Sequence, residues 1–453
     1  MLDEVRPLAD AFAASGHELY LVGGIVRDLL IGLDVGSAAD IDLTTDARPG
    51  DIKRALAPLA DAVWAVGERF GTIGARIGSR QFEITTHRAE SYEAGSRKPA
   101  VAFGDDIEDD LARRDFTVNA MALSVTAAEP ALVDPFGGAA DLGAKRLRTP
   151  RSPEASFTDD PLRMLRAARF IAGYGLEPAP ELVDAVRTLA HRLEIVSAER
   201  IRDELDKLLQ VKDPSAGLWF VVDTGLADEF LPELAAMRLE QDPIHHHKDV
   251  LAHTIAVVAK TQPERIVRLA ALLHDVGKPK TRSFTDGGVT FHHHEVVGAR
   301  MARDRMQALK YSNDDVETVR QLVYLHLRFH TYRLGWTDSA VRRFVRDAGD
   351  HLDELIELTR CDCTTRNERK AATLARRMDE LVERIAELRQ REELEAIRPD
   401  LDGKQVMDHL GLGPGPHIGQ ALDHLLEIRL DEGPLDEAEA YRRLDAWWAG
   451  QNG

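Results

Sequence analysis

The sequence predicts an α+β protein, with a small mixed sheet in the first 135 residues and an all-helical region after it. Two observations support this fold class. Before residue 135, short apolar runs of strand length alternate with segments of helical periodicity. After the segment 134–138, apolar residues recur almost entirely at helical spacing, and prolines separate one helical segment from the next. This order indicates an N-terminal domain that contains the whole sheet.

The expected elements follow from these periodicities. Helices are expected over 1–15, 25–31 and 51–59, and strands over 17–22, 41–44, 62–66, 71–77 and 81–85. Pro150 and Pro153 mark a linker, and 160–174 begins a series of helices that continues to about residue 360. The segment 366–398 is highly charged and is expected to be one long solvated helix. The segment 411–416 is expected to be a tight turn between helices.

Length and composition describe a multidomain globular chain. At 453 residues it is too long for a single core, so two to four domains are expected. Hydrophobic residues make up 44% and charged residues 30%, an ordinary balance for folded domains. The two cysteines, Cys361 and Cys363, exclude a disulfide framework and suit a reducing cytoplasm. A C-x-C pair without other cysteines makes a weak metal site, so buried helix residues are the favoured interpretation.

The N-terminus and the net charge bear on location and partners. The first residues include acids and lack the basic segment and long apolar stretch of a signal peptide. No run approaches the ~20 apolar residues of a membrane span, so a cytoplasmic protein without a membrane partner is expected. The net charge of −19 argues mildly against nucleic acid, because phosphate binding depends on Lys and Arg. A basic stripe on one face is compatible with that total.

Asp40 and Asp42 form a D-x-D pair at the start of an expected strand. Residues i and i+2 of a strand face the same side, so both carboxylates project together and favour a hard divalent cation such as Mg²⁺. Alone, such a pair is more often two solvated turn aspartates. Gly23 and Gly24, followed by Arg27, strengthen the metal interpretation, because glycines at a strand-to-helix turn let backbone N–H groups approach a phosphate.

Five ordered motifs extend this pattern along the chain. They are GGIVRDLLIG at 23–32 with DIDLTT at 40–45, RRDFTVNAMAL at 113–123, DPFGGAADL at 134–142, DDPLRMLRAARF at 159–170 and SAERIRDEL at 197–205. Together they resemble the class II tRNA nucleotidyltransferases and the bacterial poly(A) polymerases, which belong to the polymerase-β-like superfamily. The resemblance implies a nucleotidyltransferase head with a mixed sheet, followed by a helical neck and body.

The resemblance also implies roles for the first motif. Asp40 and Asp42 would bind Mg²⁺, which lowers the pKa of the 3′-hydroxyl and clamps the triphosphate. Contacts to the triphosphate would come from Gly23, Gly24 and Arg27.

Further roles in the head fall on the second motif and on a strand before it. Arg113, Arg114 and Asp115 would lie near the incoming nucleotide, with Asp115 at the ribose; the alternative is a surface Arg–Asp pair. Glu83 stands where the superfamily often has a third catalytic carboxylate, and a structural strand residue is an equal alternative. The segment 88–99 resembles the mobile catalytic loop of the family, with Arg97 within reach of phosphate.

Asp160 and Arg163 are expected to read the base. Three residues apart, they would share one helix face and offer an acceptor beside a fork of donors. In the family the equivalent pair acts as a protein template that selects CTP and then ATP. The family usually has Glu-Asp here, whereas this chain has Asp159-Asp160, which shortens one acid and keeps the base reader. The alternative is an ordinary ion pair of little consequence.

A positive stripe is expected nearby, facing the acceptor stem of tRNA. Its arginines are Arg163, Arg166, Arg169 and Arg202, of which Arg166 and Arg169 are also expected at the nucleotide. The alternative is that these arginines pair with neighbouring acids, namely Asp159, Asp203 and Glu204.

The 17 histidines are concentrated between residues 245 and 330. The runs 245–247 and 292–294 are compatible with metal binding and equally with exposed histidines that bind nothing. A pattern resembling the HD metal-dependent phosphohydrolases is more informative. Its minimal set is His253, His274, Asp275 and Asp362, and the extended set adds His294 and His326. Imidazole and carboxylate suit Mn²⁺, Fe²⁺, Ni²⁺ or Mg²⁺. The alternative is a retained helical domain that no longer catalyses.

Four domains are therefore expected: a nucleotidyltransferase head (1–145), a helical neck that binds RNA and nucleotide (146–240), an HD domain (241–365) and a helical tail (366–453). Within the tail, 401–422 resembles a turn of related enzymes, for which contact with the RNA backbone and a structural bend are equal alternatives.

The implied function is CCA addition to the 3′ end of tRNA. C, C and A would come from CTP and ATP without a nucleic-acid template, by divalent-metal-assisted attack of the 3′-hydroxyl on the α-phosphate. Three alternatives stay open: a poly(A) polymerase, an enzyme that adds only part of CCA, and an HD-type phosphohydrolase on an RNA-binding scaffold. The lack of a strongly basic terminal extension disfavours the first, and intact Asp40 and Asp42 disfavour the last. The expected partners are tRNA, CTP and ATP, with the chain a monomer or homodimer.

Overall fold

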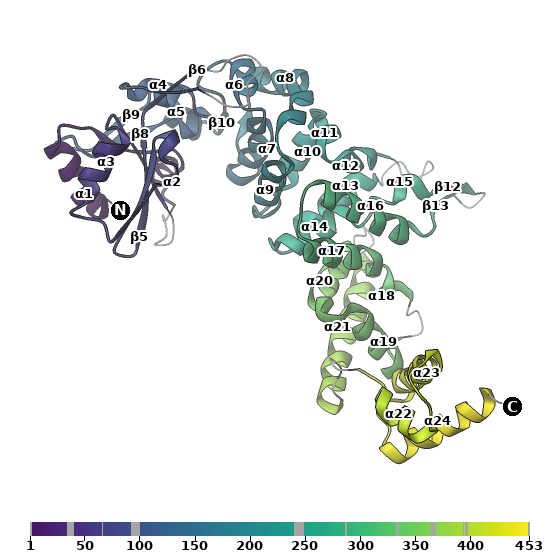
Figure 1. Cartoon of the computed structure of the whole chain (residues 1–453). Coiled ribbons are helices and arrows are strands. Elements are labelled where there is room, and N and C mark those ends of the chain that lie inside the picture. Colours follow the sequence, from purple (N-terminus) through teal and green to yellow (C-terminus); the bar gives the residue numbers. More distant parts are fainter. Residues whose placement is uncertain are drawn as a thin grey trace. The chain divides into compact units, whose positions relative to one another are not determined.

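In the computed structural model of the chain, seven strands among the described residues form one mixed sheet near the N-terminus (Figure 1). They are β1 (Leu19–Val22), β2 (Ile41–Thr45), β3 (Ala62–Trp64), β4 (Thr72–Ile77), β5 (Arg80–Thr86), β8 (Ala122–Ser124) and β9 (Ala131–Val133). The order across the sheet is β3-β4-β5-β2-β1-β8-β9. β2 and β5 run parallel and the other neighbours antiparallel, so the mixed sheet is confirmed.

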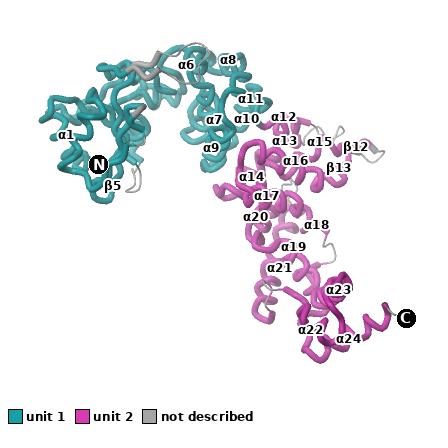
Figure 2. The backbone as a smooth tube through the Cα atoms, viewed as in Figure 1, with its two compact units in different colours: residues 1–230 teal, residues 231–453 magenta. Residues whose placement is uncertain are grey.

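The structure describes residues 2–33, 40–65, 67–91, 100–239, 249–285, 288–331, 335–363, 368–392, 394 and 397–451. The chain divides into two compact units, residues 1–230 and 231–453 (Figure 2). The helices and strands predicted before residue 86 are confirmed within a few residues of their expected ends.

Both faces of β1 are buried, which explains its unbroken apolar run. Leu19 and Leu21 pack into a core with α1 (Leu2–Ala14) and α3 (Pro49–Leu56). Tyr20 and Val22, which alternate with them, pack on the other face with Leu111 of α4 (Ile107–Ala112). Alternate residues of a strand point to opposite faces, so a central strand covered on both sides must be apolar throughout. The short helix α2 (Gly24–Leu30) follows β1 directly.

Several short strands were not predicted. They are β6 (Arg88–Ser91) with β7 (Ala100–Phe103), β10 (Arg146–Leu147) with β11 (Glu177–Pro178), and β12 (Arg282–Thr285) with β13 (Gly288–Phe291). The last hairpin corrects the expectation of an almost entirely helical region. Its strands bury little apolar surface, since Phe284 is 67% exposed. The sequence therefore shows no alternation of apolar residues that would predict these strands. The signal that was available is the Asp286-Gly287 dipeptide between them, a strong hairpin turn sequence.

The first unit continues with helices α5 (Gly138–Gly143), α6 (Pro153–Asp159), α7 (Leu162–Tyr174), α8 (Pro180–Leu189), α9 (Ala198–Leu209), α10 (Ser215–Asp223) and α11 (Leu226–Phe230). Serine caps position two of them: the side chains of Ser152 and Ser197 accept backbone N–H groups in the first turns of α6 and α9. The predicted helix 160–174 begins two residues late, because Asp160 is extended and Pro161 precedes the first turn.

The second unit is helical apart from the hairpin, within the described residues. Its helices are α12 (Pro232–Ala236), α13 (Val250–Lys260), α14 (Arg265–Leu273), α15 (Lys278–Thr281), α16 (His294–Ala308), α17 (Asn313–Leu325), α18 (Arg328–Thr331), α19 (Asp338–Ala348), α20 (Leu352–Asp362), α21 (Glu368–Arg391), α22 (Gly403–Leu410), α23 (Pro416–Glu432) and α24 (Glu437–Gln451). The predicted turn at 411–416 is confirmed between α22 and α23. Within the described part of the chain, no helix has the length and apolar character needed to cross a membrane.

The long helix α21 confirms one prediction and corrects part of it. The helix is present, but it is not solvated all round. Met378, Leu381, Ile385 and Leu388 are buried at helical spacing and form an apolar face. The high charge of the segment concealed this stripe, because the charged residues occupy the remaining faces.

Candidate active site and metal centre

The carboxylates of the head meet where β2 and β5 run side by side. Asp42 and Glu83 are register partners on these parallel strands, so their side chains share one face, and Asp40 immediately precedes β2. Partial burial raises the pKa of Asp42; the nearby Glu83 and Asp40 carboxylates add to this, and Arg114 opposes it. The oxygens of the three acids are not all within 4.8 Å of one another. Such a site suits Mg²⁺, which takes few protein carboxylates and completes its shell with substrate phosphates.

Gly23 allows an arginine to approach the start of α2. Its φ is +77°, and a Cβ at this position would lie 2.9 Å from Nη1 of Arg114. The turn is held by its N–H, which donates to the Met121 carbonyl at 3.3 Å. Gly24 begins α2, where the first N–H groups point out of the helix. The two predicted glycines therefore lie beside a guanidinium, an arrangement that suits an anion.

A buried acid that the sequence did not single out organises the RRD motif. Asp110 is fully buried; its Oδ1 accepts from Nη2 of Arg113 at 2.7 Å and its Oδ2 from Nη2 of Arg114 at 3.1 Å. Burial opposes ionisation, but the two guanidinium groups outweigh it and lower the pKa of Asp110 to about 2. Arg114 keeps a buried Nε–H without a hydrogen-bond partner among the described residues. The available signal was the spacing, since Asp110 precedes the arginines by three and four residues on one helix face.

Arg27 contacts other groups than those expected. It is 5% exposed and donates to Asp28 at 2.9 Å, to the Asn119 side chain at 2.6 Å and to the Tyr174 hydroxyl. Its guanidinium also stacks on the Phe170 and Tyr174 rings, at 5.3 and 4.1 Å from their centroids. These contacts connect α2 of the head to α7, and Arg27 does not line the cavity of the RRD motif.

Asp115 also forms hydrogen bonds within the protein. Its Oδ1 accepts from the Phe116 N–H at 2.9 Å and the Asn119 amide at 3.0 Å, and its Oδ2 accepts from Nε of Arg166 at 2.9 Å. Burial opposes ionisation, but Arg166 and Asn119 lower the pKa of Asp115 to about 2. Asp115 is 8% exposed, so the alternative of a surface pair is wrong, and the residue also lines the adjoining cavity.

A cavity of about 270 Å³ collects most of the predicted nucleotide contacts. It is lined by Arg113, Arg114, Asp115, Asp160, Leu162, Arg163, Arg166 and Arg200. The side chains come from the RRD motif and from α7, with Asp160 from the connection before α7 and Arg200 from α9. Five arginines against two acids give the lining a positive balance, which suits a polyphosphate or nucleotide.

The base-reading pair is present, but not on one helix face. Asp160 precedes α7 in an extended conformation, and Oδ1 accepts the Leu162 N–H at 3.2 Å. Arg163 lies in the helix, where it donates to Ser156 Oγ at 2.9 Å and to the Arg113 carbonyl. The expectation of a shared face was wrong because Pro161 starts the helix after Asp160. Both side chains nevertheless line the cavity.

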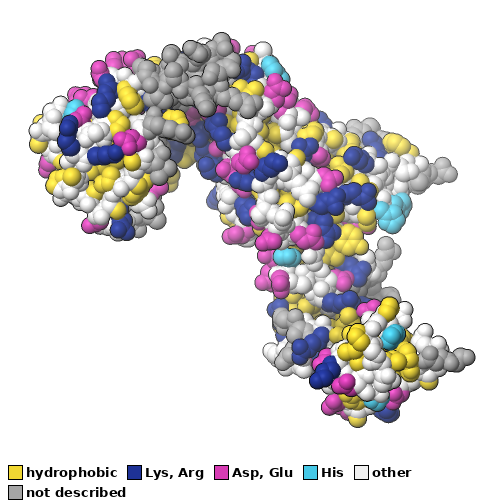
Figure 3. All heavy atoms as spheres, in the orientation of Figure 1, with side chains coloured by type: hydrophobic (Ala, Val, Ile, Leu, Met, Phe, Trp, Pro, Cys, Tyr) yellow, Lys and Arg dark blue, Asp and Glu magenta, His cyan; other side chains and the backbone are white. Residues whose placement is uncertain are grey.

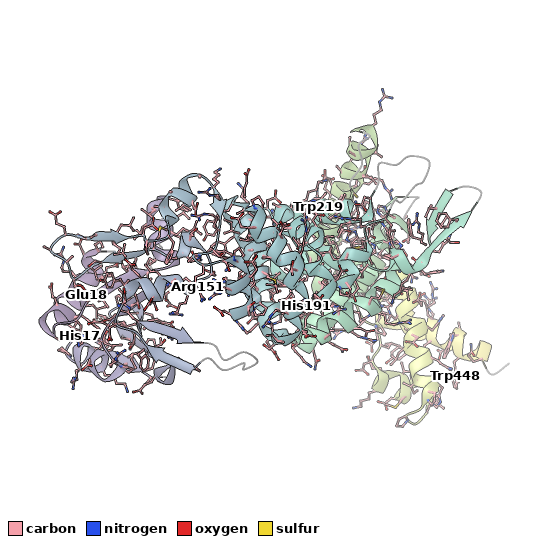
Figure 4. All side chains as sticks on the ribbon, turned by 90° about the horizontal axis from the view of Figure 1, so that it is seen from above. His17, Glu18, Arg151, His191, Trp219 and Trp448 are labelled. Carbon is pink, nitrogen blue, oxygen red and sulfur yellow. The ribbon has the colours of Figure 1, made fainter. Side chains whose placement is uncertain are left out.

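The predicted positive stripe is largely paired. Arg169 binds the buried Glu204, whose second oxygen lies 3.9 Å from Nη1 of Arg166. Arg202 pairs with Asp203 at 2.8 Å. Asp159 takes a different partner, Arg151, which is labelled in Figure 4 on the connection into α6. Basic and acidic side chains are interspersed over the face seen in Figure 3. These contacts favour the alternative in which most of these arginines pair with neighbouring acids.

The six predicted HD ligands come together in the second unit. They fall into two groups of three, each with ligand atoms within 4.8 Å of one another: His253, His274 and Asp362; and Asp275, His294 and His326. Asp275 connects the groups, since its oxygens lie 3.5 Å from His253, 3.2 Å from His274 and 3.4 Å from His294. Each ligand stands at or near a helix end: the histidines at 274 and 326 are the C-caps of α14 and α17, and Asp362 ends α20.

The imidazoles are oriented for a cation. Nδ1 of His274, His294 and His326 lies 2.7, 2.8 and 2.6 Å from the carbonyl oxygen three residues earlier, so each Nδ1–H donates there and Nε2 is left to face the cluster. Nε2 of His294 and His326 is buried without a hydrogen-bond partner among the described residues. Orphaned buried acceptors in a carboxylate cluster fit a bound divalent ion.

Charge in this cluster is unevenly distributed. Burial opposes protonation of His274, but Asp275 and Asp362 outweigh it and raise its pKa to about 10. Burial and the neighbouring His274 lower the pKa of His326 to about 3. Lys278 approaches Asp275 at 2.6 Å. The carboxylates of Asp275 and Asp362 therefore stabilise positive charge at this position, as expected of a cation site.

The remaining metal candidates do not join these groups. His292 and His293 are exposed and belong to neither. Cys361 is buried at the end of α20 and its thiol contacts Glu357, in agreement with a plain helix residue. The histidines 245–247 and Arg97 lie outside the described residues. Arg88, in the same segment as Arg97, donates to Thr72 at 3.0 Å.

A mixed sheet with paired carboxylates at its parallel strands, joined to an arginine-lined cavity, defines a nucleotidyltransferase with a polymerase-β-like head. Three family models match the chain: the poly A polymerase head domain at residues 19–148, the probable RNA- and SrmB-binding site of polymerase A at 175–238, and the HD domain at 245–381. Divalent-metal dependence is typical of both the nucleotidyltransferase and the HD domains.

Curated relatives narrow the class. The A-adding tRNA nucleotidyltransferase of Deinococcus radiodurans is 35% identical over 437 residues, covering 93% of this chain and 94% of that one. The CCA-adding enzyme of Bacillus velezensis is 40% identical over 230 residues, 51% of this chain and 55% of that protein. The matched region thus spans about half the length of the Bacillus relative. The solved Bacillus stearothermophilus CCA-adding enzyme in complex with CTP shares the fold, with a TM-score of 0.70 and 23% identity over 99% of this chain and 98% of that one. The chain belongs to the tRNA nucleotidyltransferase and poly(A) polymerase family.

Proposed function

We propose that the chain adds CCA to the 3′ end of tRNA, from CTP and ATP and without a nucleic-acid template. The observation that carries the proposal is the convergence of Asp160 and Arg163 with the RRD arginines on one cavity, in the same compact unit as the D-x-D strand. The name of the Bacillus velezensis relative agrees with it, and solved CCA-adding enzymes of this fold were bound to CTP, ATP and tRNA.

In this mechanism the carboxylates of the head hold the reacting groups. Asp40 and Asp42, assisted by Glu83, would hold Mg²⁺. A divalent ion, when bound, polarises the α-phosphate and favours ionisation of the attacking 3′-hydroxyl. Gly23 and Gly24 would offer backbone N–H groups to the triphosphate.

The arginines of the cavity balance the charge and read the base. Arg114 has a free buried Nε–H and would neutralise phosphate oxygens. Arg163 would donate to the ring nitrogen of the base, and the Asp160 carboxylate would accept from its exocyclic amine. Arg166 and Arg169, held by Asp115 and Glu204, would keep α7 in place behind them.

Incorporation assays with single nucleotides test the proposal. Purified protein is given a tRNA transcript that ends before CCA, with CTP alone, ATP alone or both. We expect two cytidines with CTP alone and a complete CCA end with both, read by gel and by sequencing of the product. Long A-tails without C incorporation would instead identify a poly(A) polymerase.

A second candidate is addition of the terminal A only. It is favoured by one observation: the relative that aligns over nearly the whole chain is an A-adding enzyme. The same assay separates the two functions if it includes a transcript that ends in CC. An A-adding enzyme extends that transcript with ATP and leaves the transcript without CC unchanged.

The second unit would carry a separate hydrolytic site. We propose that the six HD ligands hold one or two divalent ions, Mn²⁺, Fe²⁺, Ni²⁺ or Mg²⁺, and act as a phosphohydrolase centre. The orphaned Nε2 atoms of His294 and His326 support this assignment. A protein without transferase activity that still hydrolyses phosphoesters would instead favour the scaffold alternative.

We also propose four domains, at 1–145, 146–240, 241–365 and 366–453. The proposed location is the cytoplasm, and the proposed oligomeric state is a monomer or homodimer.

A further inference from the structure

One arginine in the nucleotide cavity has no role in the scheme above. Arg200 lies in the first turn of α9, where the Ser197 hydroxyl accepts its backbone N–H at 3.4 Å. Its Nη2 donates to Oδ2 of Asp160 at 2.8 Å, although the two residues are 40 positions apart in the chain. Both side chains line the cavity, and they are 52% and 26% exposed. The capped helix end therefore presents Arg200 directly to the base-reading acid.

The second base reader is held by other groups. The Arg163 guanidinium donates to Ser156 and to the Arg113 carbonyl; its backbone N–H donates to the Asp160 carbonyl at 3.1 Å, but the structure gives no hydrogen bond between the two side chains. This separation is informative, because opposite charges attract, so the Asp160 carboxylate stays apart from Arg163 only where another cation holds it. If Asp160 turned to Arg163, each would neutralise the other and neither would face a base.

Base chemistry requires the two readers to stay apart. Cytosine and adenine present an exocyclic amine, which donates, whereas uracil and guanine present a carbonyl oxygen at the same edge. An ionised carboxylate accepts from the amine and repels the carbonyl. A carboxylate has about four acceptor positions, so Asp160 can receive Arg200, the Leu162 N–H and an amine together.

We propose that Arg200 is a positioning residue for nucleotide selection: its ion pair holds Asp160 toward the cavity and away from Arg163. The inference rests on the proposed nucleotide addition and names a residue of the same site. Arg200 touches Asp160 rather than the reacting atoms. Its loss should therefore change which nucleotide is accepted more than how fast an accepted nucleotide reacts.

The test compares Arg200→Gln with Arg200→Lys and with Arg187→Gln. Arg187 is a matched control, an ion-paired arginine on α8 that lines no part of the cavity. For each protein, kcat and KM are measured with CTP, UTP, ATP and GTP on tRNA transcripts, and the melting temperature is recorded. We expect Arg200→Gln to lower the preference for CTP over UTP and for ATP over GTP by about tenfold, the loss of one charge-assisted hydrogen bond. Lysine should restore part of the preference, and the control should match the wild type.

A second variant distinguishes positioning from general structural support. In an Asp160→Asn background, Arg200→Gln should cause no further change in preference, because the partner of Arg200 has lost its charge. Equal losses with all four nucleotides, or preferences unchanged from the Arg187→Gln control, would overturn the proposal. Failure of the proposed function is a different result: the wild-type protein would then incorporate neither C nor A.

Discussion

The two units of the chain treat buried carboxylates in opposite ways. In the first unit, Asp110 and Glu204 are buried and each is contacted by two arginines. In the second, the buried Asp275 is contacted by Lys278 and by histidines, two of which keep a ring nitrogen without a hydrogen-bond partner among the described residues. The arginines of the first unit therefore neutralise its buried carboxylates, whereas the histidine nitrogens of the second unit suit binding of a metal ion. The difference teaches that internal ion pairs can hold the side chains around a cavity in place, whereas a cluster of histidines and carboxylates keeps nitrogen atoms available for an added cation.

The largest expected effect is on Asp42, one of the head carboxylates proposed to hold Mg²⁺. Asp42→Asn should lower nucleotide incorporation by about 10³-fold, equal to about 4 kcal/mol of transition-state stabilisation, because it removes a metal ligand. Single-turnover incorporation measures this. Asp105→Asn, which changes a carboxylate 83% exposed in the same unit, should leave the rate within about twofold. Full activity in Asp42→Asn would refute the assigned metal site.

A change in the second unit should affect metal binding and spare the transferase. Asp275→Asn removes the acid that connects both ligand groups, so affinity for Mn²⁺ should fall by about 100-fold. Elemental analysis and calorimetric titration of the full chain measure this, with incorporation assayed in parallel. Asp304→Asn, at an exposed acid of α16, is the control. Unchanged metal content in Asp275→Asn would contradict the proposal that the buried carboxylate of the second unit binds a metal ion.

Among the internal pairs, Glu204→Gln should destabilise the first unit by about 2 kcal/mol. The change leaves Arg169 without its buried charge partner and weakens its neighbour Arg166. Denaturant unfolding measures the loss, and Glu199→Gln, at an exposed position of the same helix, should cost less than about 0.5 kcal/mol. A loss no greater than that of the control would show that the nucleotide pocket does not depend on this pair.

The smallest expected effect separates backbone strain from crowding. Gly23→Ala and Gly32→Ala both place alanine at positive φ, +77° and +71°, and each should cost about 1 kcal/mol of stability. A Cβ at Gly23 would also meet Arg114 at 2.9 Å, whereas one at Gly32 meets nothing within 4 Å. KM for CTP and ATP should therefore rise only in Gly23→Ala. Equal KM values in the two variants would argue against contact between Arg114 and the triphosphate.

Local patterns predicted most of the fold and part of the site. Period-two alternation and the D-x-D spacing located Asp42 on its strand, and the HD ligands were assigned by their resemblance to a family. Contacts between distant segments were not predictable in the same way. Asp115 meets Arg166 across 51 residues and Asp160 meets Arg200 across 40, and no local rule encodes such pairs. The contact of Arg27 with Tyr174, which is 147 residues away, was unpredictable for the same reason.

That contact of Arg27 bears on how the chain can be divided. Its guanidinium lies between the Asn119 side chain of the head and the aromatic face of α7, so a fragment ending near residue 145 would lose the ring and expose a buried cation. An engineered chimaera that joins this head to the neck of a relative should therefore exchange Arg27 and Tyr174 as a pair. The head and α7 come from separate segments of the sequence, but they belong to one compact unit of the chain.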